Sequence, residues 1–340
     1  MNLALLGYSI TYISTLFCDK VTFANIFFGE SMKDKKQLLG TAAALFTNVI
    51  FGFSFLFSKV ALGYAHPLMI LSVRFTVAFL ILNILWLTGV FKLSFKGKSK
   101  KRILLMALAQ PLCYYIFELY GINNSSSAMS GVIISLVPVA VIILAGVFLH
   151  ERATLRQILF SALSLMAVAI ISIMTDDGAQ SSPLGILLLL GAVVCAAVFN
   201  ILSRDLSAEY SPIERTYIMF FAGCVGFNII SPAVLGKSYI SELTSAVCEP
   251  MFWGAIAYLS VASSIIAFLC YNYSTTVLTP VKSASFSNLI TVVSVLAGIF
   301  ILGESMTSIQ LVCCALIVAG VIGTNSNNTQ KQESKNDKQV

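Results

Sequence analysis

LHERATLRQ, at residues 149–157, returns as LGESMTSIQ at residues 302–310. Leu, Glu, Thr and Gln recur in register, at a separation of 153 residues (304 − 151). An apolar segment with small residues precedes each copy, and another follows it. Repetition on this scale inside a hydrophobic chain indicates a duplicated membrane bundle, and duplicated bundles are typical of transporters.

Composition also indicates a membrane protein. Of 340 residues, 58% are hydrophobic and 11% are charged, with a mean hydropathy of +0.90, whereas soluble domains carry about 25% charged residues. The net charge of +6 comes from Lys and Arg in short loops, a distribution that orients a membrane protein and predicts no nucleic-acid partner. Eight Cys without a C-x-x-C spacing and two His predict no metal site, no disulfide framework and no cofactor.

Ten apolar runs approach the roughly 20 residues that a helix needs to span a bilayer. They lie near residues 38–62, 67–88, 102–121, 126–149, 155–175, 183–203, 213–235, 251–273, 279–302 and 308–324. We therefore expect an all-α integral membrane protein with ten transmembrane helices.

Positive charge alternates between the connections. It gathers before the first span, in residues 92–102, in residues 152–156, at Arg204 and Arg215 around the loop after the sixth span, and in the tail. The intervening loops carry little of it. The positive-inside rule places the basic connections and both termini in the cytoplasm, and the expected location is the cell membrane.

Each half has five spans, an odd number, so the second half is expected to be inverted relative to the first. At an offset of 145, Ser58-Lys59 matches Ser203-Arg204 and Pro67 matches Pro212. The change from 145 to 153 predicts a difference of eight residues in loop length. Inverted repeats of this kind form a substrate cavity at their interface, near the membrane midplane.

The segments Tyr120–Gln157 and Tyr273–Gln310 resemble the two EamA-type units of the drug/metabolite transporter superfamily. The family's pattern is a small-residue helix start, a mid-helix Pro and a closing Leu-Gly-Glu. Pro138 holds the Pro position and Thr291 replaces it in the second copy; His150 stands where Gly303 keeps the family's Gly. The resemblance covers about residues 38–324. It implies ten helices in two inverted repeats that carry small metabolites, often as amino-acid exporters.

The chain is thus expected to divide into four parts. Residues 32–175 form the first repeat and residues 183–324 the second. Residues 1–31 neither span a bilayer convincingly nor resemble a signal peptide. Either the product starts at Met32, which is the favoured alternative, or residues 1–31 form an interfacial or loosely held segment; a chain that starts at Met32 is expected to insert and transport. Residues 325–340 are polar and low in complexity, which predicts a disordered cytoplasmic tail.

Four ionisable residues lie within the expected spans, where burial is costly and such groups usually face the bundle interior. They are Lys59, Arg74, Glu118 and Arg204. Arg74 and Glu118 both fall toward the extracellular side, where they are candidates for pairing with each other or for meeting a substrate. Lys59 and Arg204 are expected to be structural, with Lys59 reaching the interface by snorkelling.

Glu118 is the candidate for proton coupling and the centre of the predicted substrate site. Gln110, Tyr114 and Glu118 are spaced i, i+4, i+8 and are expected to share one helix face, which Tyr115 borders. Pro111 interrupts the hydrogen bonding of the same helix. Six further candidates for the site are Asn48, Phe55, Asn200, Ser264, Tyr271 and Asn272.

Aromatic rings with a few amides and hydroxyls suit a small amphipathic metabolite. Helix–helix packing is the alternative role for each of these residues. Glu151 and Glu304 each stand three residues before a Thr at a helix boundary. They are expected to accept backbone N–H bonds at the start of the next helix and to hold the fold rather than bind substrate.

The predicted function is transport of a small organic metabolite by alternating access, with an amino-acid or related metabolite exporter as the leading possibility. The alternative, a nucleotide-sugar or phosphorylated-metabolite carrier, calls for several Lys or Arg that converge on phosphate. An intramembrane enzyme is a remote alternative, because the chain contains neither H-E-x-x-H nor G-x-S-x-G. The expected partners are a small-molecule substrate and the lipid bilayer, and a homodimer is left open.

Overall fold

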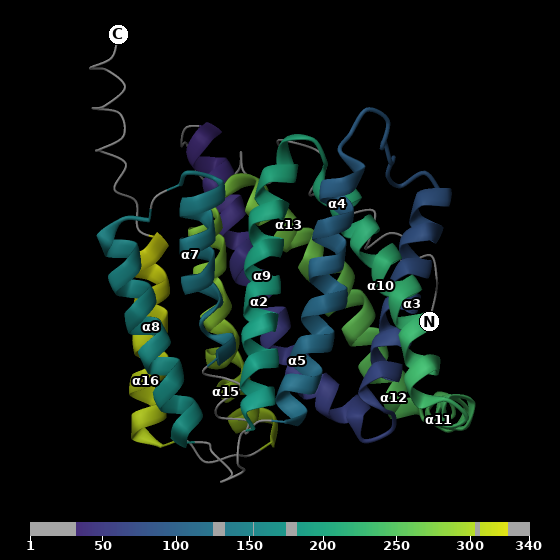
Figure 1. Cartoon of the computed structure of the whole chain (residues 1–340). Coiled ribbons are helices and arrows are strands. Elements are labelled where there is room, and N and C mark those ends of the chain that lie inside the picture. The colour runs from purple at the N-terminus through teal and green to yellow at the C-terminus, as the bar shows by residue number, and fades with distance from the viewer. Residues whose placement is uncertain (1–31, 125–132, 152, 175–181, 303–306, 326–340) are drawn as a thin grey trace. The chain divides into compact units, whose positions relative to one another are not determined.

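The computed structural model describes residues 32–124, 133–151, 153–174, 182–302 and 307–325, and its secondary structure in these ranges is helical (Figure 1). The first half contains α2 (Met32–Leu62), α3 (Pro67–Leu87), α4 (Lys100–Ala107), η1 (Leu108–Cys113), α5 (Tyr114–Asn123), α7 (Val137–Phe148) and α8 (Leu155–Met174). The second half contains α9 (Pro183–Asp205), η2 (Leu206–Ala208), α10 (Pro212–Leu235), α11 (Ser238–Val247), α12 (Pro250–Ala257), η3 (Tyr258–Ile266), α13 (Ala267–Val277), α14 (Pro280–Ser285), η4 (Phe286–Asn288), α15 (Leu289–Leu302) and α16 (Ser308–Asn325).

Within these ranges, nine helices are long and apolar enough to cross a membrane, and the shorter apolar helix α7 is the tenth segment. They coincide with the ten predicted spans, apart from small shifts at the ends and the residues before α7 that lie outside the described ranges. The prediction of an all-α membrane protein with about ten helices is therefore confirmed. The expectations for residues 1–31 and 326–340 fall outside the described residues.

The backbone reproduces the repeat that the sequence predicts. α5 begins at Tyr114 and α13 at Ala267, while α8 begins at Leu155 and α16 at Ser308. Both pairs are separated by 153 residues (267 − 114 and 308 − 155). The chain is therefore built from two copies of one five-segment unit, and an odd number of crossings gives the second copy the opposite topology.

The repeated phrase of the sequence forms the same helix cap twice. The Thr154 N–H donates to Oε1 of Gln157 at 2.9 Å, and the Thr307 N–H donates to Oε1 of Gln310 at 3.0 Å. In return each Gln N–H donates to the hydroxyl of its Thr at 3.3 Å. The capping oxygen thus comes from Gln157, not from Glu151 as expected, because Gln at the third helical position completes a capping box with the Thr.

Most of the extra residues of the second copy lie between the starts of its second and third spans, where the offset grows from 145 (212 − 67) to 150 (250 − 100). α10 has 24 residues where α3 has 21, and the amphipathic helix α11 occupies the connection. The sequence predicted a longer loop but not this helix, which is too short and too polar to read as a span.

Pro138 breaks its span less centrally than the family pattern implies. It stands at the second residue of α7, after a helical turn at residues 133–136. A proline costs little there because the N–H groups of the first turn have no intrahelical partner. The second copy has a 3₁₀ turn, η4, at the equivalent place ahead of α15, although Thr291 replaces the Pro.

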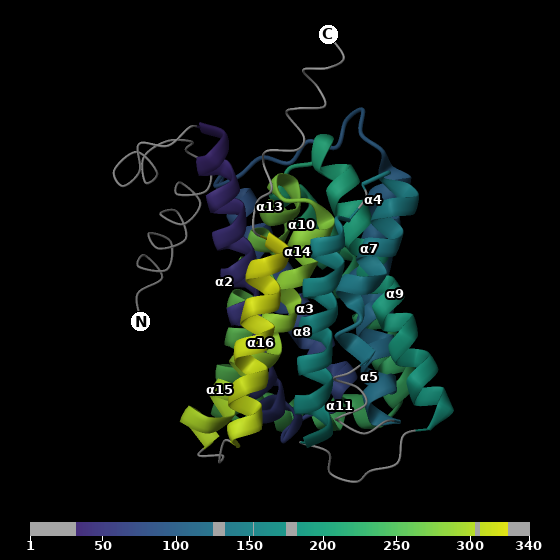
Figure 2. The same ribbon diagram turned by 90° about the vertical axis from the view of Figure 1, so that its left-hand side faces the viewer.

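Packing groups the helices into two compact units that interleave the two sequence repeats. Unit 1 comprises Met1–Ile50, Phe57–Leu112 and Leu206–Leu278, and unit 2 comprises Phe51–Leu56, Cys113–Asp205 and Thr279–Val340. In unit 1, α10 packs along α3, α4 and α13; in unit 2, α8 packs on α16 and α9 packs on α5 and α7 (Figures 1 and 2). Each unit therefore combines helices from both halves of the chain.

Small residues allow the closest of these contacts. A Cβ added to Gly320 of α16 would lie 2.7 Å from Cβ of Ser164 and 2.8 Å from the backbone oxygen of Phe160 on α8. A Cβ atom, which forms no hydrogen bond, does not tolerate such distances, so α8 and α16 approach this closely because position 320 lacks a side chain.

Candidate functional site

π-Helical segments widen the third and eighth spans at equivalent places. Residues 108–113 of η1 correspond to residues 261–266 of η3 at the offset of 153 (261 − 108). Inside η1 the backbone leaves helical geometry at Gln110, with φ −145° and ψ 123°. Such segments release backbone groups from the regular ladder and are frequent at functional sites.

Tyr114 and Glu118 make the predicted one-turn contact in unit 2. The Tyr114 hydroxyl donates to Oε1 of Glu118 at 2.8 Å, and the ring of Tyr115 meets that of Tyr114 edge-on at 5.3 Å between centroids. Gln110 does not extend this face as expected, because the backbone break lies between it and Tyr114. The described site in unit 2 is thus a phenol–carboxylate pair just beyond a helix break.

Arg74 and Ser264 come together in unit 1. Nε of Arg74 donates to the Ser264 hydroxyl at 2.8 Å, and Nη2 donates to the Ser263 hydroxyl at 3.1 Å. The Arg74 side chain is 5% exposed and its guanidinium carbon lies 5.6 Å from the centroid of the Phe75 ring. η3 therefore presents two hydroxyl groups to a buried cation. Arg74 and Glu118 belong to different units, so their pairing stays a prediction.

The three candidate asparagines are engaged in helix contacts. Asn48 and Asn200 donate to the carbonyl oxygens of Ala44 and Ala196, one turn earlier, at 2.7 and 2.9 Å. Asn272 is fully buried and its amide donates to Thr216 at 3.0 Å, which joins α13 to α10. These contacts favour the packing role for all three.

The remaining candidates stay predictions. Tyr271 is half-buried in unit 1, and nothing described tests its contact with a substrate. The side chains of Phe55 and Lys59 lie outside the described residues, as does Glu304. Of the other expected structural residues, Arg204 places Nε 3.9 Å from Oε1 of Glu151.

Arg215 is a buried residue that the sequence suggested only as a loop charge. It is 0% exposed in the first turn of α10, where Nη1 donates to the Thr275 hydroxyl at 3.2 Å and Nη2 donates to the Asn272 carbonyl. Its position three residues after Pro212 was the available signal, since Pro commonly opens a helix and the residues after it are helical.

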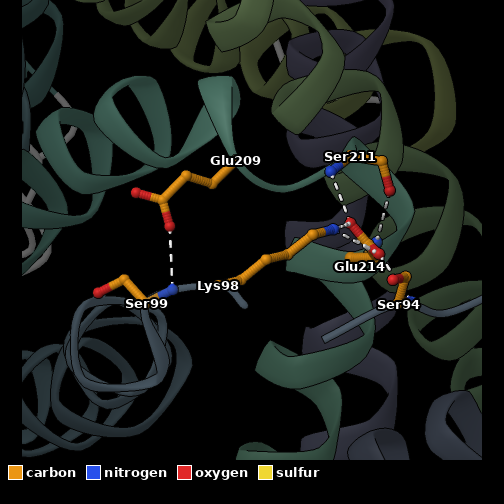
Figure 3. Close-up of polar contacts among 6 residues, drawn as sticks. All are labelled: Ser94, Lys98, Ser99, Glu209, Ser211 and Glu214. Atoms are coloured by element: carbon orange, nitrogen blue, oxygen red, sulfur yellow. Dashed lines mark hydrogen bonds and ion pairs between the residues drawn. The ribbon is translucent and has the colours of Figure 1, made fainter. Parts of the chain in front are cut away.

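A polar clamp fastens the α3–α4 connection to the start of α10 in unit 1 (Figure 3). The carboxylate of Glu214 accepts from Nζ of Lys98 at 2.7 and 2.8 Å and from the backbone N–H groups of Ser94 and Ser211, each at 2.9 Å. Ser211 also caps α10 through its hydroxyl. One buried carboxylate thus holds the connection, the helix start and a cation together.

A second carboxylate completes the polar clamp. Glu209 accepts from the Ser99 N–H at 3.0 Å and forms an ion pair with Arg102 (Figure 3 shows the Ser99 contact). Tyr210 lies between the two carboxylates in sequence, with its ring centroid 4.9 Å from Nζ of Lys98. Burial, together with Glu209 and Glu214, raises the pKa of Tyr210, so the phenol stays neutral beside the cation.

The comparisons with known proteins agree with this architecture. The model of the EamA-like transporter family matches residues 21–173 and 183–326. The Bacillus subtilis protein named uncharacterized transporter YcxC is 35% identical over 302 residues, which cover 88% of this chain and 97% of that protein. The probable terminal-alkyne amino-acid exporter of Streptantibioticus cattleyicolor is 26% identical over 212 residues, or 62% of this chain and 68% of that protein.

A solved crystal structure shares the fold, with a TM-score of 0.69 over 84% of this chain and 95% of its own; at 15% identity the likeness concerns the fold alone. The two family matches coincide with the two copies seen in the sequence and in the helix boundaries. The chain is therefore a multi-pass membrane protein that belongs to the EamA-like transporter family of the drug/metabolite transporter superfamily.

Proposed function

We propose that the protein exports an amino acid or a closely related small metabolite by alternating access. The observation that carries this proposal is the pair of equivalent π-helical segments, η1 and η3, each next to polar groups within a membrane span; η1 is also broken at Gln110. A helix broken as η1 is at Gln110 forms part of the substrate site in many transporters with inverted repeats. The amino-acid exporter among the relatives supports the substrate class.

Each unit contains one polar group that suits one of the two charges of an amino acid. Glu118, with Tyr114 as its hydrogen-bond donor, offers a carboxylate for a substrate ammonium group. Arg74, held by Ser263 and Ser264, offers a guanidinium for a substrate carboxylate. A phosphorylated substrate would call for further cations beside Arg74, and Arg215 is enclosed between α10 and α13.

We place both termini in the cytoplasm. The basic α3–α4 connection carries Lys92, Lys96 and Lys98, and the positive-inside rule assigns such a connection to the cytoplasmic side. A reporter fused after Asn325 tests this arrangement: activity of a periplasmic or extracellular reporter there would contradict it.

Transport by the purified protein tests the substrate class. Proteoliposomes would be loaded with labelled neutral amino acids, a sugar phosphate or a nucleotide sugar, and efflux measured with and without a pH gradient. We expect efflux of an amino acid, accelerated by the gradient if Glu118 exchanges a proton. Efflux of only the phosphorylated solutes would refute the proposal and favour the alternative carrier.

Variants separate a binding role from a folding role. Glu118→Gln and Arg74→Gln should abolish most transport, whereas Glu209→Gln in the polar clamp should leave it largely intact. Protein abundance in the same membranes controls for misfolding. Equal transport by all three variants would show that neither Glu118 nor Arg74 contributes to substrate binding.

A further inference from the structure

Helix α11 has no helical counterpart in the first repeat, and it lies between two membrane spans. Gly236 ends α10 with a φ of 55°, a backbone conformation that glycine adopts without strain. In Figure 1, α11 is seen nearly end-on while α10 lies lengthwise. The chain therefore turns sharply after α10, and α11 runs across the ends of the spans rather than along them.

One face of α11 packs on the apolar core of unit 1. Ala246 is 1% exposed, and Tyr239 and Leu243 pack against the same cluster, which includes Ala65 and Ile70 near the start of α3. Positions 239, 243 and 246 are spaced by four and three residues, so they lie on one side of a helix. This face fixes the rotation of α11 about its own axis.

The two other faces of α11 differ from each other. Residues of an α-helix follow one another at about 100°, so Ile240 and Val247, seven residues apart, share one flank. These side chains are 71% and 40% exposed. The opposite flank carries Ser238, Ser241 and Ser245, all exposed. α11 therefore has a protein face, an exposed apolar flank and an exposed hydroxyl flank.

The apolar flank continues onto the next span. Met251 and Trp253, at the start of α12, are 62% and 40% exposed. The indole Nε1 of Trp253 donates to the carbonyl oxygen of Val247 at 2.8 Å, which fastens the end of α11 to α12. Tryptophan is enriched at the membrane–water interface because its ring is apolar and its N–H is polar.

We propose that α11 lies in the interfacial layer of the bilayer, with Ile240 and Val247 against phospholipid and the serine flank toward water. The spans on either side end at the bilayer surface, so a helix that crosses their ends lies at the depth of the lipid headgroups. The basic α3–α4 connection lies at the other end of α3, so by the orientation proposed above this is the extracellular leaflet.

The occupant of the apolar flank is lipid rather than a second copy of the chain. A stable protein interface uses about 20–30 residues per partner, whereas the flank offers four exposed apolar side chains. They also adjoin the surface of a transmembrane helix, which faces acyl chains by its position. Lipid on one flank and water on the other accounts for both kinds of side chain.

Tryptophan fluorescence in lipid nanodiscs tests the proposal, because both membrane faces are then open to reagents. The chain has two Trp, so Trp86→Phe with Trp253→Phe gives a background without them. Ile240→Trp and Ser245→Trp then report separately on the two exposed flanks. Both positions are exposed, so neither substitution disturbs the core.

We expect phospholipids brominated near the headgroup to quench Ile240→Trp at least twice as strongly as Ser245→Trp, and aqueous iodide to show the reverse order. Equal lipid quenching of the two, or strong iodide quenching of Ile240→Trp, would overturn the proposal. Shielding of Ile240→Trp from both quenchers, with two copies per nanodisc, would assign the flank to a second copy and also overturn it. Native Trp253 in the Trp86→Phe variant is a second reporter, for which we expect lipid quenching.

Discussion

The buried carboxylate of the polar clamp should contribute strongly to stability, and Glu214→Gln isolates its charge. The substitution keeps the size of the side chain but replaces one oxygen with an NH₂ group. Lys98 then loses its counter-charge, and one of the backbone N–H groups of Ser94 and Ser211 meets a donor instead of an acceptor.

The expected loss of stability depends on how exposed the side chains of Glu214 and Lys98 are. Removing one partner of a buried ion pair costs about 3–5 kcal/mol, and a hydrogen bond to a charged group contributes about 1.5–3 kcal/mol. The Glu214 side chain is 5% exposed, but that of Lys98 is 21% exposed and can recover water. We therefore expect Glu214→Gln to lower the free energy of unfolding by about 3 kcal/mol, at the low end for buried pairs.

The matched control is Glu209→Gln. Its ion pair with Arg102 has side chains that are 32% and 46% exposed, and exposed pairs contribute about 0–1 kcal/mol. Thermal unfolding in detergent would rank the two variants, and limited trypsin cleavage at Lys96 would report release of the connection. Equal losses for the two variants, or no added cleavage in Glu214→Gln, would refute the argument from burial.

Three tests concern other parts of the structure. Gly320→Val should force α16 away from α8, at a cost of about 1–3 kcal/mol that is measured as a lower unfolding temperature. Gly254→Ala places its methyl group in open space and should not destabilise the protein, since Ala favours a helix more than Gly does. Equal destabilisation by the two variants would contradict the close approach. Gln310→Ala removes the cap of α16 and should lower the free energy of unfolding by about 1 kcal/mol. Gln157→Ala should lower it by a similar amount. A loss of stability in only one of the two variants would show that the caps are not equivalent. Glu118→Gln should keep wild-type abundance but cut transport at least tenfold, and an unchanged rate and pH profile would leave Glu118 a structural partner only.

The fold was predictable from sequence because the signals that specify it are local and occur twice. Apolar runs of the length of a bilayer give the spans. The phrase around Thr154 and Thr307 marks two helix starts that the structure caps in the same way. The offset of 153 residues also relates η1 to η3 in the structure, although the sequence did not predict these segments.

The site was less predictable because it depends on where side chains find partners. Spacing alone placed Gln110 on the face of Tyr114 and Glu118, but a backbone break separates them. Spacing also gave no hint that Asn48 and Asn200 donate to their own helices. The sequence did not predict Ser263 as a partner of Arg74. The hydroxyl groups of the neighbouring residues Ser263 and Ser264 both bind the same cation in the π-helical segment η3, which a regular helix pattern does not indicate.

Two equivalent connections, the one after α3 and the one after α10, are held to unit 1 by different interactions: polar contacts at one end and apolar packing at the other. In the first repeat, the connection after α3 is held at the start of α10 by ion pairs such as Lys98–Glu214. In the second repeat, α11 joins the start of α3 through an apolar cluster that includes Ala246 and Ile70. The positive-inside rule supplies a reason for the difference, because cytoplasmic connections are rich in Lys and Arg and outer ones are not. With the orientation proposed above, the outer connection has few cations with which to form ion pairs, so it is held by apolar burial and, we infer, by the lipid surface.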